Sequence, residues 1–426
     1  MEKEQFKQEL KLALKNPKAY FDVKKQKDPI TNKTETVCNT EKLNRFFQAF
    51  STNYLDADIA GLAEQFPKIE FTTLSERDKF AVGKYNNDTK QINLNLDMFL
   101  TAMKTPLKTG AFAGYMVTLC HEHQHFKQYL YADLKKNGNL EAAKKLEPML
   151  GLSPNSEYGV SVSEIEEVIN KPISGQSLIA HEVFMSNTIP EKFKQMKSNN
   201  FLVNELGKKF GKRSPIEMAY YFHDPHEVDA RERAVEVFYG KMTEISGGDP
   251  EIEKPLKSIE KFLKLANKTS LKIQPKEVID KFVAEKENIS EEQLLSFASK
   301  IQSTLDKEKI DAKTLHDENY SKFGDGHPTY DEVERYSFII VLKERLASLP
   351  PEEANKLAES LGASGIPYVS YVLDEVLSSK TIDKVESSQI KAERSEMGEN
   401  TPTINTPSKQ KTRQNELELE KESQPE

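Results

Sequence analysis

The chain has 426 residues, of which 30% are charged and 37% hydrophobic, and its formal net charge is −8. This acidic balance excludes a basic surface over the whole molecule, so a nucleic-acid partner is unlikely, although a local basic patch stays compatible with it. The length allows roughly two or three domains, with a core of considerable size.

The sequence predicts a cytoplasmic protein. The first five residues are too charged to begin a secretory signal, and no run of about 18 apolar residues could form a membrane span. Two cysteines, Cys38 and Cys120, do not make a disulfide framework. Export without a signal peptide would leave no trace in such a sequence, so it stays an alternative.

Residues 1–67 are expected to form an N-terminal helical segment. Apolar residues recur there at helical spacing, for example Leu43, Phe46, Phe47 and Phe50. No residue pattern in the segment suggests chemistry. We interpret it as a helical cover on the catalytic core, with a separate adaptor role as the alternative.

Residues 68–96 change to the period of β-strands. The stretches 80–85 and 91–96 flank a run of turn formers, which predicts a hairpin, and residues 69–71 form a further possible strand. We therefore expect a small antiparallel sheet beside the helix that follows. Its edge strand could hold an extended substrate through the main chain, or it could be purely structural.

The pattern His-Glu-x-x-His occurs at His121, Glu122 and His125. Residues 112–136 contain no proline and carry apolar residues at helical spacing, which predicts a helix that stops at Asn137 and Gly138. Residues four apart share one helix face, so the two imidazoles could bind one Zn²⁺. Glu122 lies about 100° further round, where it could take a proton from a water activated by the metal.

Two other interpretations concern the same helix. It could be an amphipathic helix with histidines on its surface and no metal. His123 points to nearly the opposite side from His121, so we expect it to be structural or solvated.

A third ligand is expected near Pro225. Proline favours the first position of a helix, which would put Glu227 in the first turn. A catalytic zinc site with two helix histidines needs one more protein ligand and leaves the fourth position for water. We expect Glu227 in this role; His223 and His226 are rivals for it or helpers near the oxyanion. The alternative for Glu227 is a favourable charge at a helix N-terminus.

His-Glu-x-x-His followed by Pro225, Glu227 and Ala230 resembles the gluzincin type of zinc metallopeptidase, over roughly residues 76–245. The resemblance implies a zincin-like core with a glutamate as third ligand on a second helix. Many relatives place an aspartate four residues after that glutamate, where it orients a histidine. This chain has Arg231 there and Asp229 two residues before it. The long gap between the motifs implies an insert at about residues 139–215.

Residues 246–379 are expected to form a C-terminal helical region. Within it, His327 follows a Gly-Asp-Gly loop at a helix entry and could donate to an oxyanion, or it could be a turn histidine without a role. Residues 380–426 contain no aromatic residue, which predicts a disordered charged tail that could contact a protein partner.

Together these patterns predict a predominantly helical α+β fold with a zincin-like core and accessory helices. The predicted function is a zinc-dependent metallopeptidase that acts on a peptide or protein substrate. Its Zn²⁺ would be held by His121, His125 and Glu227, with Glu122 as general base. The candidate donors to the oxyanion are His223, His226, Tyr221 and His327. The alternative is a catalytically silent zincin-fold protein that binds metal or serves as an interaction scaffold.

Overall fold

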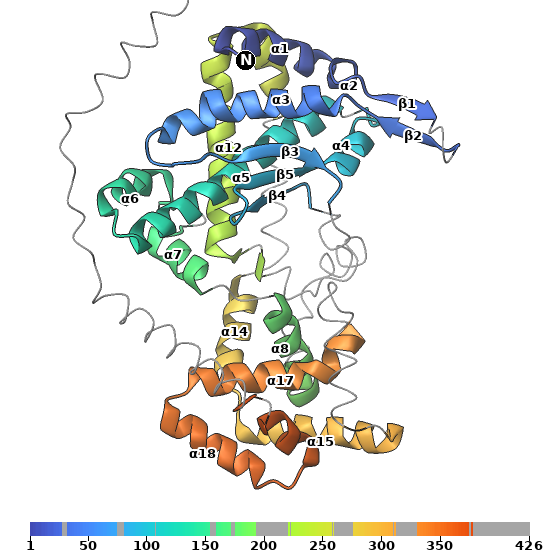
Figure 1. Cartoon of the computed structure of the whole chain (residues 1–426), viewed down its shortest axis with the longest axis vertical. Coiled ribbons are helices and arrows are strands. Elements are labelled where there is room, and N and C mark those ends of the chain that lie inside the picture. Colours follow the sequence, from blue (N-terminus) through green and yellow to red (C-terminus); the bar gives the residue numbers. More distant parts are fainter. Residues whose placement is uncertain are drawn as a thin grey trace, which may run out of the picture. The chain divides into compact units, whose positions relative to one another are not determined.

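The computed structural model describes residues 1–27, 32–74, 81–106, 108–153, 159–171, 175–192, 220–221, 223–257, 259, 276–309, 311, 330–374 and 376–377. Helices predominate among them, as the sequence predicts, and small sheets accompany the helices (Figure 1). Within these residues, no helix is both long enough and apolar enough to cross a lipid bilayer.

The N-terminal segment contains three helices, a π-helical turn, a 3-10 turn and two strands. They are α1 (Lys3–Lys15), α2 (Pro17–Tyr20), β1 (Lys24–Lys27), β2 (Thr34–Val37), α3 (Thr40–Phe50), the π-helical turn η1 (Ser51–Leu55) and the 3-10 turn η2 (Asp56–Ile59); the strand β3 (Lys68–Thr72) follows the segment. The antiparallel pair of β1 and β2 corrects the expectation of a wholly helical segment. Both strands are polar and largely exposed, so they lack the apolar alternation that would have revealed them.

A three-stranded sheet precedes the motif helix. Its strands are β3, β4 (Gly83–Asn86) and β5 (Gln91–Asn95), in the order β3-β5-β4. The predicted hairpin is confirmed as the antiparallel pair of β4 and β5, whereas β3 runs parallel to β5. The sheet is therefore mixed rather than antiparallel. Alternation of side chains identifies a strand but carries no information on its direction.

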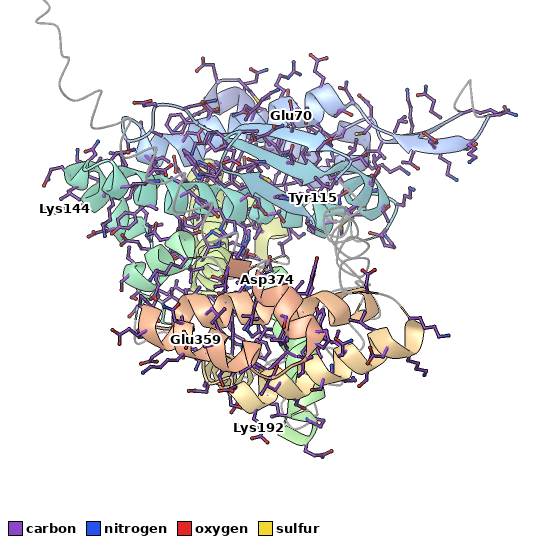
Figure 2. The ribbon with its side chains drawn as sticks, turned by 60° about the horizontal axis from the view of Figure 1, so that its bottom comes forward. Glu70, Tyr115, Lys144, Lys192, Glu359 and Asp374 are labelled. Atoms are coloured by element: carbon purple, nitrogen blue, oxygen red, sulfur yellow. The ribbon has the colours of Figure 1, made fainter. Side chains whose placement is uncertain are left out.

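The motif helix is α5 (Lys108–Lys136), which follows α4 (Leu96–Ala102). It ends before Gly138, whose φ of +76° suits a helix stop. The Tyr115 hydroxyl, labelled in Figure 2, donates to the carbonyl of Asn95 at 2.8 Å and ties α5 to the end of the sheet. Its partner helix α12 (Pro225–Ser246) packs along it.

One hydrophobic core joins the N-terminal segment to both of these helices. Phe6, Phe46, Phe112, Leu119 and Phe238 all belong to it, and each is fully buried. The N-terminal helices therefore help to build the surroundings of α5. Three shorter elements follow α5: α6 (Leu140–Leu146), the 3-10 turn η3 (Glu147–Met149) and α7 (Val162–Asn170).

The remaining helices form a second group. They are α8 (Gly175–Thr188), α14 (Lys276–Glu287), α15 (Glu291–Glu308), α17 (Tyr330–Ser348) and α18 (Pro351–Gly362). α15 begins with a capping box, in which Ser290 and Gln293 form reciprocal hydrogen bonds. Rings of Phe184, Phe297 and Phe338 contact one another in this group. The expected tail at 380–426 and the part of the expected insert that follows residue 192 lie outside the described residues, and the domain boundaries stay predictions.

Candidate metal centre

The start of α12 is fixed by its own sequence. The Asp224 side chain accepts a hydrogen bond from the backbone N–H of His226 at 2.9 Å, and Pro225 occupies the first helical position. Glu227 therefore lies in the first turn. The buried Ala230 and Phe238 continue the face of α12 that packs on the core. This arrangement brings Glu227 to the side of α5 that carries the histidines.

The three predicted ligands come together. Nε2 of His121 and Nε2 of His125 are 3.0 Å apart. The carboxylate oxygens of Glu227 lie 3.3 Å from Nε2 of His121 and 3.6 Å from Nε2 of His125. Two ligands about 2.1 Å from one tetrahedral zinc ion would be roughly 3.4 Å apart. The donor atoms are thus spaced as a shared zinc ion requires.

The hydrogen bonding of Glu227 also fits a cation. Its Oε2 is buried and has no hydrogen-bond partner among the described residues, although an imidazole nitrogen lies 3.3 Å away. A buried carboxylate oxygen without a donor is costly unless a positive charge satisfies it. The set of two imidazoles and one carboxylate is one that zinc accepts.

Glu122 lies beside this cluster. Its Oε2 accepts a hydrogen bond from the backbone N–H of Tyr85 on β4 at 2.8 Å. A Cβ at Gly83, on the same strand, would lie 3.1 Å from Oε1 of Glu122, so the strand approaches closely only because residue 83 is glycine. The main chain of β4 thus holds the side chain that was predicted to be the base.

The other predicted site residues differ in position. The ring of His226 stacks on that of His125 with centroids 4.0 Å apart, and its buried Nε2 has no hydrogen-bond partner in the described part of the chain. Two groups among the described residues could hold a metal ion: His121 with Glu122 and His125, and His125 with His226 and Glu227. His223 is half-buried just before α12 and belongs to neither group. His327 lies outside the described residues.

Tyr221, one of the candidate oxyanion donors named from the sequence, contacts a proposed ligand. Its hydroxyl donates a hydrogen bond to Glu227, while 37% of the residue's surface remains exposed. The negative charge of Glu227, together with burial of the hydroxyl, raises the pKa of Tyr221 well above its usual value. Its proton therefore stays on the phenol at neutral pH.

The electrostatics of the cluster favour a positive charge. Burial is the largest single influence on the pKa of His125 and lowers it, but the carboxylates of Glu227 and Glu122 and the hydrogen bond to Gln128 together raise it to about 9. Burial is likewise the largest influence on the pKa of Glu227 and raises it, but His125 and His121 together hold this pKa well below its usual range. Burial and the charge of Glu227 raise the pKa of the neighbouring Asp224 to about 6.

His123 is structural, one of the two roles expected for it. It is only 1% exposed, and its Nε2 lies 2.8 Å from Oδ1 of Asp56 in η2. The Ser51 hydroxyl donates to the same oxygen at 3.2 Å. This buried contact fixes the side of α5 that faces away from the metal ligands.

Gln128, which sequence reasoning missed, and Asp229 support His125. Gln128 lies one turn further along α5, and its Oε1 is 2.9 Å from Nδ1 of His125. Its amide nitrogen donates to Oδ2 of Asp229 on α12 at 2.7 Å. The only signal in the sequence was the spacing of Gln124 and Gln128 along the motif helix, together with Asp229 near the expected ligand.

Comparison of the chain with protein-family models, with curated proteins and with solved structures gives no match. The gluzincin resemblance therefore rests on the two sequence motifs alone.

Proposed function

We propose that this protein is a zinc-dependent metallopeptidase. The observation that carries the proposal is the approach of the donor atoms of His121, His125 and Glu227 to within 3.0–3.6 Å of one another. Glu122 offers a carboxylate oxygen within 4.8 Å of donor atoms of His121 and His125, and its Oε2 accepts a hydrogen bond from the backbone of β4. A site that only stored metal would not need this second carboxylate.

His121, His125 and Glu227 would hold the ion. Zn²⁺ bound there supplies Lewis-acid polarisation of a water molecule and of a substrate carbonyl. The N–H of Tyr85 holds Oε2 of Glu122, so Oε1 is left to accept a proton from the attacking water and to pass it to the leaving amine. The protonated phenol of Tyr221 and the ring of His226 are the candidates for donors to the developing oxyanion; His223 and His327 stay predictions for the same role.

A peptide is the substrate class that the strand arrangement favours. β4 is an edge strand, since the sheet order is β3-β5-β4. The N–H of Tyr85 points away from β5 and toward Glu122, so this outer edge borders the proposed base. An extended peptide could add to such an edge through main-chain hydrogen bonds, which would bring its carbonyl groups past the site.

The test compares the wild-type chain with Glu122→Gln and His125→Ala in zinc content and in cleavage of a proteome-derived peptide library. The amide oxygen of Glu122→Gln can still accept from Tyr85, so we expect it to keep zinc and to lose cleavage by about 10²–10⁴-fold. His125→Ala should lose zinc and cleavage together. Single-turnover cleavage at the wild-type rate by Glu122→Gln would refute the mechanism.

A catalytically silent zinc-binding or scaffold protein is the second candidate, favoured by His226. The donor atoms of His125, His226 and Glu227 lie within 4.8 Å of one another. If Nε2 of His226 supplied a fourth donor, the tetrahedral shell would be closed to water. In that case His226→Ala should weaken zinc binding as much as His121→Ala, and the wild-type chain should cleave nothing. An open catalytic site predicts that His226→Ala keeps its zinc. A protein partner for residues 380–426 stays a prediction under either function.

A further inference from the structure

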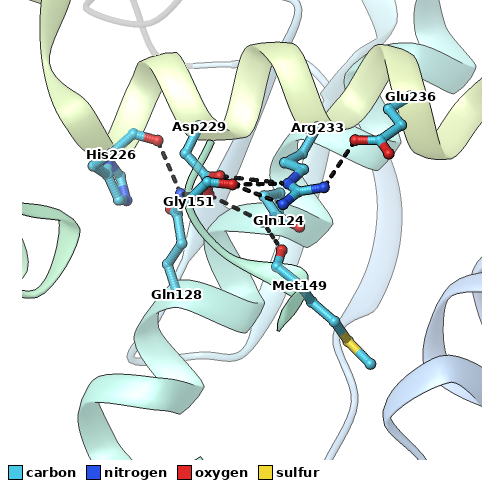
Figure 3. Close-up of polar contacts among 8 residues, drawn as sticks. All are labelled: Gln124, Gln128, Met149, Gly151, His226, Asp229, Arg233 and Glu236. Atoms are coloured by element: carbon cyan, nitrogen blue, oxygen red, sulfur yellow. Dashed lines mark hydrogen bonds and ion pairs between the residues drawn. The ribbon is translucent and has the colours of Figure 1, made fainter. Parts of the chain in front are cut away.

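A chain of buried hydrogen bonds runs from the proposed ligand His125 through Gln128 to α12. Figure 3 shows its second half, from Gln128 to Asp229 and the backbone of His226. Nδ1 of His125 is 2.9 Å from Oε1 of Gln128. The amide nitrogen of Gln128 donates to Oδ2 of Asp229 at 2.7 Å and to the backbone carbonyl of His226 at 3.0 Å. Gln128 and Asp229 are both fully buried, and His125 is 5% exposed. Neither of the two sequence motifs requires these hydrogen bonds.

The acceptors at the far end determine the direction of every bond. A carboxylate and a carbonyl can only accept, so the nitrogen of the Gln128 amide must face Asp229 and His226. Its oxygen then faces His125, and Nδ1 of that ring must carry the hydrogen. Nε2 is left with its lone pair, and Nε2 is the atom that faces His121 and Glu227.

We propose that Gln128 is a positioning residue of the metal centre, and that Asp229 acts through it to set the tautomer and the ring orientation of His125. This inference rests on the zinc site proposed above. Ligand histidines in proteins usually donate their second N–H to a carboxylate, a carbonyl or a water. In this chain a glutamine amide lies between the imidazole and the carboxylate, so the negative charge of Asp229 is kept one residue away from the ligand.

The position of Asp229 is itself defined by neighbours on two helices. The Gln124 amide donates to Oδ2 of Asp229 at 3.0 Å, and Nε of Arg233 lies 3.9 Å from Oδ1. Arg233 is held in turn by hydrogen bonds to the carbonyl of Gly151 at 2.7 and 3.0 Å. The carboxylate therefore has a fixed orientation before any metal binds.

Gln124 provides a matched control within the same network. It lies one turn before Gln128 on α5, is 2% exposed, and donates both to Asp229 and to the carbonyl of Met149, the latter at 2.8 Å. The hydrogen bonds found for it reach a carboxylate and a carbonyl, as those of Gln128 do, but they do not reach an imidazole. If the glutamines only stabilise the packing of the two helices, replacing either should have the same consequences.

The experiment measures zinc affinity by competition with a chelator and thermal stability of the metal-free full-length chain, for Gln128→Met, Gln124→Met and Gln128→Glu. Methionine fills the volume of glutamine without its hydrogen bonds. We expect Gln128→Met to bind zinc about 10–100-fold more weakly. Gln124→Met should lose markedly less zinc affinity for a similar loss of stability, because Gln128 still contacts His125 and still donates to Asp229 and to the carbonyl of His226. Cobalt-substituted Gln128→Met should also show a shifted visible absorption spectrum, because the ring of His125 is no longer held.

Gln128→Glu should change the stability of the chain without changing its zinc affinity. It keeps an acceptor for Nδ1 of His125 and places a second carboxylate against Asp229, so its stability should fall while its zinc affinity stays near that of the wild type. Equal zinc affinities for Gln128→Met and Gln124→Met, with unshifted cobalt spectra, would overturn the role of Gln128 and leave the proposed zinc site intact. A wild-type chain that binds no zinc would overturn the site and this inference together.

Discussion

Gly83→Ala tests the close approach of β4 to the motif helix. The added Cβ would lie 2.7 Å from Cγ2 of Thr118 and 3.1 Å from both Oε1 of Glu122 and Cδ2 of Leu94. Carbon atoms in good contact are about 3.5–4.0 Å apart, so at least one neighbour must move. Overpacking of this kind costs about 1–3 kcal/mol, and the loss of backbone freedom in the unfolded chain returns about 0.4–1 kcal/mol. We expect a net destabilisation of about 1–2 kcal/mol, together with a displaced Glu122.

Thr118→Ser provides the partner variant for a double-mutant cycle. It removes the methyl group at 2.7 Å and keeps the hydroxyl, which donates to the carbonyl of Gly114 at 3.0 Å. In this background Gly83→Ala should cost at least about 1 kcal/mol less, because only the contacts at 3.1 Å remain. Gly114→Ala is the matched control on α5: its Cβ would meet nothing within 4 Å, so it should stabilise the helix by about 1 kcal/mol.

Amide hydrogen exchange of α5, followed by mass spectrometry, measures the free energy of opening of this helix. The reasoning is wrong if exchange in Gly83→Ala matches the wild type, or if Thr118→Ser leaves the cost of the alanine unchanged. Under the proposed function, Gly83→Ala should also lower the rate of cleavage more than it lowers zinc affinity, because the contact displaces the base and not the ligands.

Three further predictions concern the frame of the site and the second group of helices. Asp56→Ala leaves the buried His123 without its partner, so the free energy of unfolding measured in urea should fall by about 1–3 kcal/mol. Phe46→Ala should lower the free energy of unfolding by about 3–5 kcal/mol in the same assay. It should also weaken the packing of α5, because Phe46 and buried residues of α5 belong to one core. Burial, aided by the charge of Lys286, lowers the pKa of His181 to about 4. Because this pKa lies below the unfolded value of about 6.5, the contribution of His181 to the free energy of unfolding is fully present above that pH and falls by about 3 kcal/mol as the pH drops toward 4. His181→Leu should lack this contribution when the free energy of unfolding is measured over the same pH range.

The parts of the site that the sequence predicts are those fixed by one helix or one hairpin. His121 and His125 share a face because they are four residues apart on α5, whatever else the chain does. The strands β4 and β5 followed from alternation and turn residues in adjacent segments. Glu227 came from a helix start marked by Pro225, and its distance from the histidines depends on tertiary packing that the spacing does not determine.

The parts that the sequence could not predict are contacts between distant segments. Gln128 and Asp229 are 101 residues apart, and nothing in either segment specifies the other. The stacking of His226 on His125 and the parallel pairing of β3 with β5 depend in the same way on how elements pack. The polar hairpin of β1 and β2 was not predicted for a different reason, because exposed strands carry no alternation of apolar residues.

The surroundings of the motif argue against a surface helix that merely contains histidines. Residues 122–125 are 6%, 1%, 2% and 5% exposed, although all four are polar. Successive residues of a helix point about 100° apart, so these four side chains contact different parts of the fold. Glu122 contacts β4, and His123 contacts η2. Gln124 contacts both Met149 and α12, and His125 contacts Gln128 and Glu227. A small rotation of α5 would break several of these contacts at once. Burying so many polar groups costs free energy unless each is satisfied, and here their partners fix the rotation that points two imidazoles at Glu227. A metal centre requires donor atoms that are held in position before the metal binds. A solvated amphipathic helix does not require this.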